Sequence, residues 1–301
     1  MTLAQLQAEA VQRLIAAGID ASEARTEARL LLSHASGLSR EELYLQMHTV
    51  LLPAEAQLFG LLLLRRERRE PLAYILGERE FYGLTFQVTP AVLVPRPETE
   101  FLVEAVMQRM QGHSSPRLVD VGTGSGIIAV ALARHVPAAS VFATDISPEA
   151  IAVALGNAQR HSVAEHIVFA TGDLLAPITH DAPFDAIVSN PPYIAPQEIE
   201  TLKPEVRDFE PRIALGTHGD PLHFYRRLAS EAPPLLSLGG LLAVEVGLGQ
   251  AHDVARLWKQ HGLTDIGTVR DYAGIERVVI GQAPSRCNFR PVVNATVKPV
   301  H

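Results

Sequence analysis

Apolar residues recur three or four positions apart over the first 78 residues, which is the spacing of one face of an α-helix. The segment 3–17 shows this pattern first. Start signals for further helices follow at Asp20, Ser39 and Pro53. The pattern predicts a small bundle of helices over residues 1–78.

The next stretch, residues 79–95, contains strand-forming residues in place of the helical pattern. Aromatic and β-branched residues lie on both sides of Gly83, and a glycine in this position is a turn signal. We therefore predict a β-hairpin that links the bundle to the rest of the chain.

From residue 96 onward, short apolar runs alternate with segments of helical periodicity. Such alternation is typical of a doubly wound α/β fold, in which helices cover both faces of a parallel sheet. The last two strands are separated by a few residues around Gly274, too few for a parallel crossover, so this pair should be antiparallel. Residues 96–282 are predicted to form this domain, and residues 283–301 a tail. The predicted strands lie at 117–122, 140–145, 167–173, 184–190, 239–246, 265–271 and 276–282, and the helices at 126–136, 148–160, 221–237 and 250–261.

Composition and charge exclude several classes of protein. The longest apolar run, Leu58 to Leu64, has seven residues, whereas a helix needs roughly 20 to span a bilayer. The single cysteine, Cys287, cannot form an intrachain disulfide, and the twelve histidines lack metal-ligand spacing. A formal net charge of −7 does not suit a protein that binds nucleic acid through its whole surface. We expect a cytoplasmic protein with no metal, no membrane contact and no direct nucleic-acid partner.

A glycine-rich loop, Gly122-Thr123-Gly124-Ser125-Gly126, joins a predicted strand to a predicted helix. Its alternate glycines allow a tight turn and the close approach of a ligand, toward which the helix points its free amides. Asp145 ends the next strand, where a carboxylate commonly binds the ribose hydroxyls of a nucleoside. Nicotinamide dinucleotide sites have the different spacing G-x-G-x-x-G. The stretch DVGTGSG instead resembles motif I of class I S-adenosylmethionine methyltransferases, with a purely structural turn as the alternative.

Asp173 and Leu174 follow the third predicted strand, at the same edge of the sheet as the glycine loop. In methyltransferases of this kind, a polar residue here reaches the adenine amino group, and Leu174 could pack on the adenine face. The position of Leu174 is often aromatic in such proteins. The alternative is that Asp173 caps the turn that follows it.

The fourth predicted strand stops at Asn190-Pro191-Pro192-Tyr193, because proline cannot donate to a sheet ladder. Asn190 offers a side-chain oxygen, the Pro191 carbonyl is a second acceptor held rigid by Pro192, and Tyr193 offers a flat face. Two acceptors and a flat face suit an NH2 group on a planar substrate. The purely structural alternative is an ordinary turn, since Asn-Pro pairs mark turns routinely.

Five further stretches, read with these motifs, closely resemble the PrmC/HemK family of release-factor glutamine methyltransferases. The resemblance covers residues 1 to about 282. It lies in PLAYILGEREFYG (71–83), VPRPETE (94–100), VRDFEPRIAL (206–215), AVEVGLGQ (243–250) and DYAGIER (271–277).

The resemblance implies a Rossmann-like domain, with a seven-stranded sheet and an antiparallel C-terminal strand, behind a helical domain that helps to hold the substrate. It implies methyl transfer from S-adenosylmethionine to the glutamine of the GGQ motif in class-1 peptide chain release factors, leaving S-adenosylhomocysteine. Asn190 to Tyr193 match the residues that bind the glutamine amide, and Asn190 also adjoins the cofactor. Gly122 to Gly126, Asp145, Asp173 and Leu174 match the cofactor residues. We expect a monomer, because the partner is itself a large protein.

Two other functions stay open from the sequence. One is an amino-group methyltransferase acting on adenine or cytosine in nucleic acid, and the other is a binding module that keeps the fold without the activity.

Two charged features allow both a functional and a structural interpretation. We hypothesise that Arg96 or Glu98, in the stretch PRPETE, orders the cofactor or glutamine site, although helix-start chemistry alone could explain these residues. A run of arginines such as that at 65, 66, 68 and 69 is typical of a helix face exposed to solvent. The functional alternative is that these arginines contact an acidic partner or ribosomal RNA.

Overall fold

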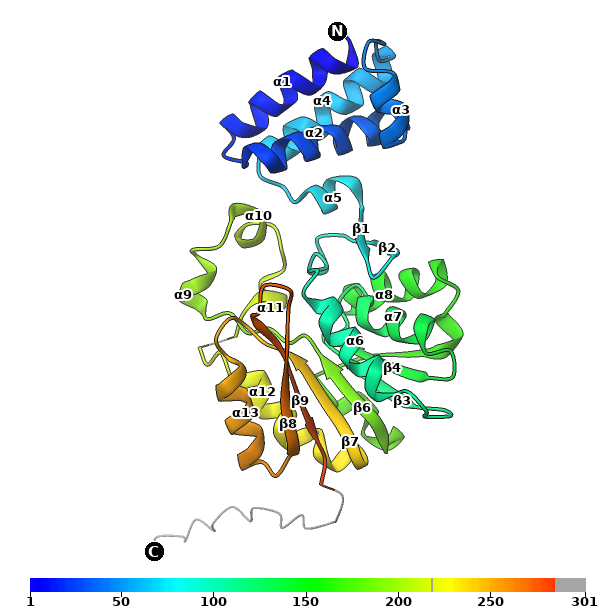
Figure 1. The fold of residues 1–301 in the computed structure, drawn as a ribbon, viewed down its shortest axis with the longest axis vertical. Coiled ribbons are helices and arrows are strands. Elements are labelled where there is room, and N and C mark those ends of the chain that lie inside the picture. The colour runs from blue at the N-terminus through cyan, green and yellow to red at the C-terminus, as the bar shows by residue number, and fades with distance from the viewer. Residues whose placement is uncertain (218, 285–301) are drawn as a thin grey trace, which may run out of the picture.

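The computed structural model describes residues 1–217 and 219–284. From residue 285 on, the predicted tail, including Cys287, lies outside the described residues. Figure 1 shows the N-terminal helices as a body above the sheet, joined to it by a short connection. Within the described part of the chain, no helix combines the length and the apolarity that a bilayer span requires.

The N-terminal body contains the predicted helices and one more. The predicted capping box at Ser39 is present, with reciprocal bonds between Ser39 and Glu42, and Pro53 opens its helix. Apolar faces of the helices meet in one buried cluster that includes Leu14, Leu31 and Leu63. The extra helix is only five residues long, too short for its periodicity to be read. The elements are α1 (Leu3–Ala16), α2 (Ala21–Ser36), α3 (Arg40–Leu45), α4 (Pro53–Glu67) and α5 (Leu72–Leu76).

A hairpin of β1 (Glu78–Phe81) and β2 (Leu84–Gln87) follows α5. Its aromatic residues Phe81 and Phe86 are buried in a core shared with the sheet domain. The Asn157 side chain accepts a hydrogen bond from the Gln87 amide (2.7 Å) and donates to the Gln87 carbonyl (2.9 Å). The hairpin is therefore anchored to the sheet domain.

The sheet has seven strands in the order β5-β4-β3-β6-β7-β9-β8. The first five in this order pair in parallel, and β9 is antiparallel to both of its neighbours. The predicted fold class is confirmed, including the antiparallel final pair. The strands are β3 (Arg117–Val121), β4 (Ser140–Asp145), β5 (Ile167–Thr171), β6 (Phe184–Ser189), β7 (Leu236–Glu245), β8 (Thr264–Arg270) and β9 (Glu276–Gln282).

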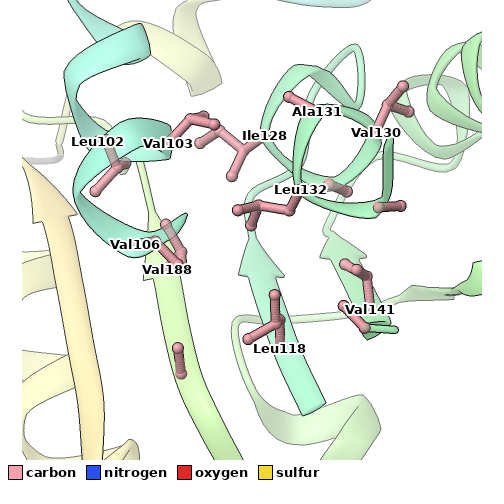
Figure 2. Packing of buried hydrophobic residues seen from close by; sticks show 14 of the residues in the cluster. Leu102, Val103, Val106, Leu118, Ile128, Val130, Ala131, Leu132, Val141 and Val188 are labelled. Carbon is pink, nitrogen blue, oxygen red and sulfur yellow. The ribbon is translucent and has the colours of Figure 1, made fainter. Parts of the chain in front are cut away.

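Helices cover both faces of the sheet, and two apolar cores result. Successive residues of a strand point to opposite faces, so Val188 joins one core and Ile187 the other. Figure 2 shows the first core, in which Leu102 and Leu132 lie over the strands. The helices of this face are α6 (Thr99–Arg109), α7 (Ile127–His135) and α8 (Pro148–Arg160), and those of the other are α12 (His223–Glu231) and α13 (Ala251–Gln260).

The segment 196–215, for which no helix or strand was predicted, contains three short helices. They are α9 (Pro196–Ile199), α10 (Pro204–Arg207) and α11 (Arg212–Leu215). Backbone bonds between Ile194 and residues Leu215 and Thr217 close the base of this excursion. We call residues 196–215 the bridging segment, because α10 lies beneath the N-terminal bundle and α11 lies at the end of the sheet nearest the bundle (Figure 1).

The interpretation of the arginine cluster as a solvated face is wrong for two of its members. Arg66 is only 3% exposed and donates to Glu27 and Glu205, while Arg69 donates to both oxygens of Glu205. Glu205 belongs to α10, so this cluster joins the bundle to the bridging segment. Arg68 is exposed, as predicted.

Candidate functional site

A cavity of about 320 Å³ opens at the carboxyl ends of the parallel strands. This is the edge at which open α/β sheets bind ligands. The cavity collects residues from both predicted constellations and from segments far apart in the sequence. The predicted site residues that line it are Gly122, Thr123, Gly124, Ser125, Asp145, Asp173, Leu174, Asn190 and Pro192.

The glycine loop has the backbone that its sequence predicts. Gly122, Gly124 and Gly126 all have φ between +55° and +83°, which favours glycine. A Cβ added at Gly122 or Gly124 would meet nothing within 4 Å, so the backbone there is open to a ligand. Asp145 accepts hydrogen bonds from the Gly124 amide (2.9 Å) and the Ser147 amide (3.0 Å), which places its carboxylate beside the loop. The open backbone of the glycine loop and the adjacent Asp145 carboxylate together fit a nucleoside.

Asp120 supports the loop from beneath. It is fully buried, and one of its oxygens accepts hydrogen bonds from the Thr123 hydroxyl (2.6 Å) and the Ala129 amide (3.1 Å). Burial raises the pKa of Asp120 to about 7, although these two hydrogen bonds oppose the shift. Thr123 is therefore held by a buried carboxyl group.

Gly126 faces protein, unlike the other two loop glycines. A Cβ there would lie 3.0 Å from the Cβ of Ala154 and 3.1 Å from its Cα, in a backbone conformation that already strains L-residues. We predict that Gly126→Ala lowers the free energy of unfolding by more than the ~1–2 kcal/mol of left-handed strain alone. Gly112→Ala is the matched control, because Gly112 has φ +86° and open space around it. Equal losses in the two variants, measured by denaturant unfolding, would contradict the proposed clash.

At the far end of the cavity, the Asp173 carboxylate accepts hydrogen bonds from Arg227 at 2.8 and 2.9 Å. Arg227, together with His223 and Phe224, brings the start of α12 to the cavity wall. The sequence predicted a helix at 221–237 but not its place at the cavity, because its residues lie 50 or more positions beyond Asp173 and match no motif. Leu174 adopts φ +47°, a left-handed conformation that turns the chain at this edge.

The Asn-Pro-Pro-Tyr stretch divides between the cavity and the core. Asn190 and Pro192 line the cavity, whereas Pro191 is buried. Tyr193 is half-buried and packs beside the second core, and its carbonyl accepts a hydrogen bond from Gln250 at 3.1 Å. A Cβ on Gly247 would meet the Tyr193 ring at 2.9 Å, so this glycine makes room for it. Burial raises the pKa of the Tyr193 hydroxyl, and nearby Glu245 adds to the effect. Tyr193 therefore stays protonated at neutral pH.

The stretch PRPETE divides between the cavity and a second cleft. Arg96 lines the cavity and donates to buried Glu210 of the bridging segment at 2.6 Å. Glu98 instead lines a separate cleft with Phe101 and Tyr272. Thr99 also lines the cavity, and sequence reasoning did not single it out.

No group of three or more His, Cys, Asp or Glu side chains in the described ranges is arranged to hold a metal ion. The side-chain amide of Asn190, carboxylates, the guanidinium groups of Arg96 and Arg227, and backbone dipoles line the cavity.

Two family models match the chain. Residues 5–77 match the PrmC N-terminal domain, and residues 97–204 match the methyltransferase small domain.

Curated relatives are similar over almost the full chain. A protein of Geobacter sulfurreducens is 47% identical over 259 residues, which are 86% of this chain and 89% of that protein. A protein of Moorella thermoacetica is 44% identical over 92% of this chain and 97% of its own length. A protein of Rhodospirillum rubrum is 42% identical, covering 97% of this chain and 88% of the relative. All three are named release factor glutamine methyltransferase.

Solved structures share the fold at low identity. The hMettl16 catalytic domain, in complex with the MAT2A 3'UTR hairpin 1, superposes with a TM-score of 0.55 and 15% identity. The match covers 78% of this chain and 81% of that one. These values show a common methyltransferase fold and carry no statement about substrate.

Proposed function

The chain belongs to the family of release factor glutamine methyltransferases, and from this premise we propose the reaction that its own residues carry out. The enzyme transfers a methyl group from S-adenosylmethionine to the side-chain amide nitrogen of the GGQ glutamine in class-1 peptide chain release factors. One observation supports this most directly: Asn190 and the glycine loop with Asp145 line a single cavity. A nucleoside cofactor and a planar amide can therefore meet there.

Gly122 to Gly126 and Asp145 would hold the cofactor, with Asp173 and Leu174 at its adenine end. Gly122 and Gly124 leave room for the ligand, and the Asp145 carboxylate is fixed beside them. When bound, S-adenosylmethionine supplies an electrophilic methyl group on a sulfonium leaving group.

Asn190 and Pro191 would activate the substrate. An amide nitrogen is a poor nucleophile, because its lone pair is delocalised into the carbonyl. If the Asn190 oxygen and the Pro191 carbonyl each accept one N–H of the glutamine, the lone pair can turn toward the methyl group. Tyr193 would support the flat amide. Catalysis then rests on positioning and fixed dipoles, with no obligatory general base, and the product nitrogen loses its extra proton afterwards.

The N-terminal bundle would hold the release factor, and the bridging segment connects it to the cavity. Such a substrate places the enzyme in the cytoplasm, and we propose that it acts as a monomer without direct contact to nucleic acid.

The test is methylation with labelled S-adenosylmethionine of a purified release factor, its GGQ glutamine variant, RNA and DNA. We expect label on the intact release factor alone. Label on RNA or DNA but not on the release factor would show the amino-group reaction on nucleic acid instead. Cofactor binding without any methylation would show a binding module.

Asp145→Ala is expected to raise the Kd for S-adenosylmethionine about 10–100-fold, because hydrogen bonds to a charged group contribute about 1.5–3 kcal/mol. The variant also loses the bond that holds the Gly124 amide. Titration calorimetry measures this affinity. The control is Asp181→Ala, which removes an exposed carboxylate outside the cavity. An unchanged Kd in Asp145→Ala would remove Asp145 from the cofactor site.

A further inference from the structure

Three side chains that are far apart in the sequence form a hydrogen-bonded row behind the Asn190 amide. The Thr99 hydroxyl donates to the Glu245 carboxylate at 2.6 Å, and the Asn190 amide nitrogen donates to the Thr99 oxygen at 3.2 Å. Thr99 is fully buried and Glu245 is 3% exposed. The row ends at the cavity, which Thr99 and Asn190 line.

The fold brings these residues together at one point. Strands β6 and β7 are parallel neighbours with Ser189 opposite Val244, so the next residues, Asn190 and Glu245, also lie side by side. Thr99 is the first residue of α6, which packs over this edge of the sheet. The juxtaposition therefore follows from strand register and helix placement.

The direction of each hydrogen bond follows from what each group can offer. An ionised carboxylate only accepts, so the Thr99 hydroxyl must give its single hydrogen to Glu245. The Thr99 oxygen then has only lone pairs left for Asn190. The amide of Asn190 must present its NH2 to Thr99, which leaves its oxygen free for the cavity. In general it is such a network that decides which way an asparagine amide points.

From this arrangement we propose that Thr99 and Glu245 are positioning residues, which fix the Asn190 amide so that its oxygen faces the substrate glutamine. The inference rests on the proposed function, because it is the glutamine N–H that needs an acceptor at this point. Neither residue transfers a proton or touches the reacting atoms. A reversed Asn190 amide would present NH2 to the NH2 of the substrate and could not bind it.

Protonation of Glu245 provides an independent readout of the same row. A protonated carboxyl group can donate to Thr99, whose hydroxyl is then free to donate to the Asn190 oxygen and reverse the amide. Burial raises the pKa of Glu245 to about 7, and nearby Glu98 adds to the shift, while Thr99, Arg277 and Asn190 oppose it. The hydroxyls of Tyr193 and Tyr225 also lie near Glu245, and both stay neutral at this pH because their pKa values are raised. Loss of the Glu245 charge as the pH falls below about 7 should therefore lower turnover.

The test compares Thr99→Val, Thr99→Ser and Glu245→Gln with the wild type. For each we would measure kcat and KM with the release factor, the Kd for S-adenosylmethionine, the thermal midpoint and the pH profile from about 5.5 to 8.5. Residues that orient metal ligands by hydrogen bonds typically contribute about 10–100-fold in activity, and we expect an effect of the same order for residues that orient an asparagine amide. We expect Thr99→Val to lower kcat/KM by about this factor with little change in cofactor Kd, and Thr99→Ser to restore most of it. In Glu245→Gln, turnover should no longer fall as the pH drops below about 7, so the acid limb of the wild-type pH profile should be absent.

The outcomes separate the two proposals. A wild-type enzyme that does not methylate the release factor would overturn the proposed function itself. An active wild type with an equally active Thr99→Val variant, or an acid limb that survives in Glu245→Gln, would overturn the positioning role. A loss of activity in Thr99→Val that only parallels losses of cofactor affinity and thermal stability would also contradict it, because that result indicates a purely structural role.

Discussion

Asn190→Ala is expected to lower kcat for release-factor methylation about 10²–10³-fold, the range measured when one preorganised hydrogen-bonding group is removed from an active site. The physical reason is that the side-chain oxygen fixes one hydrogen of a weakly nucleophilic amide. Without it, the lone pair of that nitrogen stays delocalised. Cofactor affinity should change much less, because the glycine loop and Asp145 belong to other strands and remain in place.

The measurement is single-turnover methylation with labelled S-adenosylmethionine at saturating release factor, together with cofactor titration. Gln197→Ala is the matched control, since it removes an exposed side-chain amide from the same segment of the chain. An Asn190→Ala enzyme with wild-type turnover would show that the Asn-Pro-Pro-Tyr stretch is only a turn. A loss of cofactor affinity as large as the loss in kcat would assign Asn190 to cofactor binding.

Arg66→Met is expected to lower the free energy of unfolding by about 3 kcal/mol or more, the largest loss of stability among the proposed variants. Removal of one member of a buried ion cluster leaves the charges of the other members uncompensated. Arg66 is 3% exposed and bonds to Glu27 at 2.8 Å and to Glu205 at 2.9 Å. Methionine keeps much of the apolar stem, so the change isolates the charge. Arg68→Met is the matched control, two positions away and exposed.

The same cluster predicts how stability depends on pH. Burial alone would raise the pKa of Glu205, but hydrogen bonds from Arg69 and Arg66, with that of a backbone amide, lower it from 4.5 to about 2. A carboxyl group with a lowered folded-state pKa stabilises the protein above its unfolded pKa. This contribution, about 3 kcal/mol at 1.36 kcal/mol per pKa unit, should be lost as the pH falls from about 4.5 toward 2.

Denaturant unfolding at pH 7 measures the loss of stability in Arg66→Met. The same measurement between about pH 4.5 and 2 follows the loss of the Glu205 contribution. We expect Glu205→Gln to weaken the loss of stability in acid, and hydrogen exchange to report early opening of α10 in Arg66→Met. Equal unfolding free energies for Arg66→Met and Arg68→Met would mean that the cluster contributes no net stability.

Local patterns sufficed for the fold class and for the position of most regular elements. The strand at 140–145 and the helix at 148–160 have the predicted bounds, because each has an uninterrupted pattern and a clear start signal. The three short helices of the bridging segment were not predicted. Each has only four residues, less than the span over which helical periodicity can be recognised.

The candidate site was partly readable for a similar reason. Motifs that are contiguous in sequence, such as the glycine loop, carry their chemistry in a few neighbouring residues. The roles of Arg227 and Glu245 could not be read from the sequence, although Glu245 lies in one of the family-like stretches, because each acts only through a partner on another element. The prediction for Arg66 was wrong for the same reason. One of the two carboxylates that pair with its buried guanidinium, that of Glu205, is 139 positions away.

The sequence by itself determined the chemistry available to this protein: a glycine turn that a ligand can approach, a carboxylate at the end of the next strand, and a strand that two prolines terminate after an asparagine. Only the tertiary structure decided what that asparagine presents to a substrate. Its amide can point either way in an isolated chain. Its direction is set by the register of β6 against β7, which places Glu245 beside it, and by the start of α6, which supplies the Thr99 hydroxyl between them.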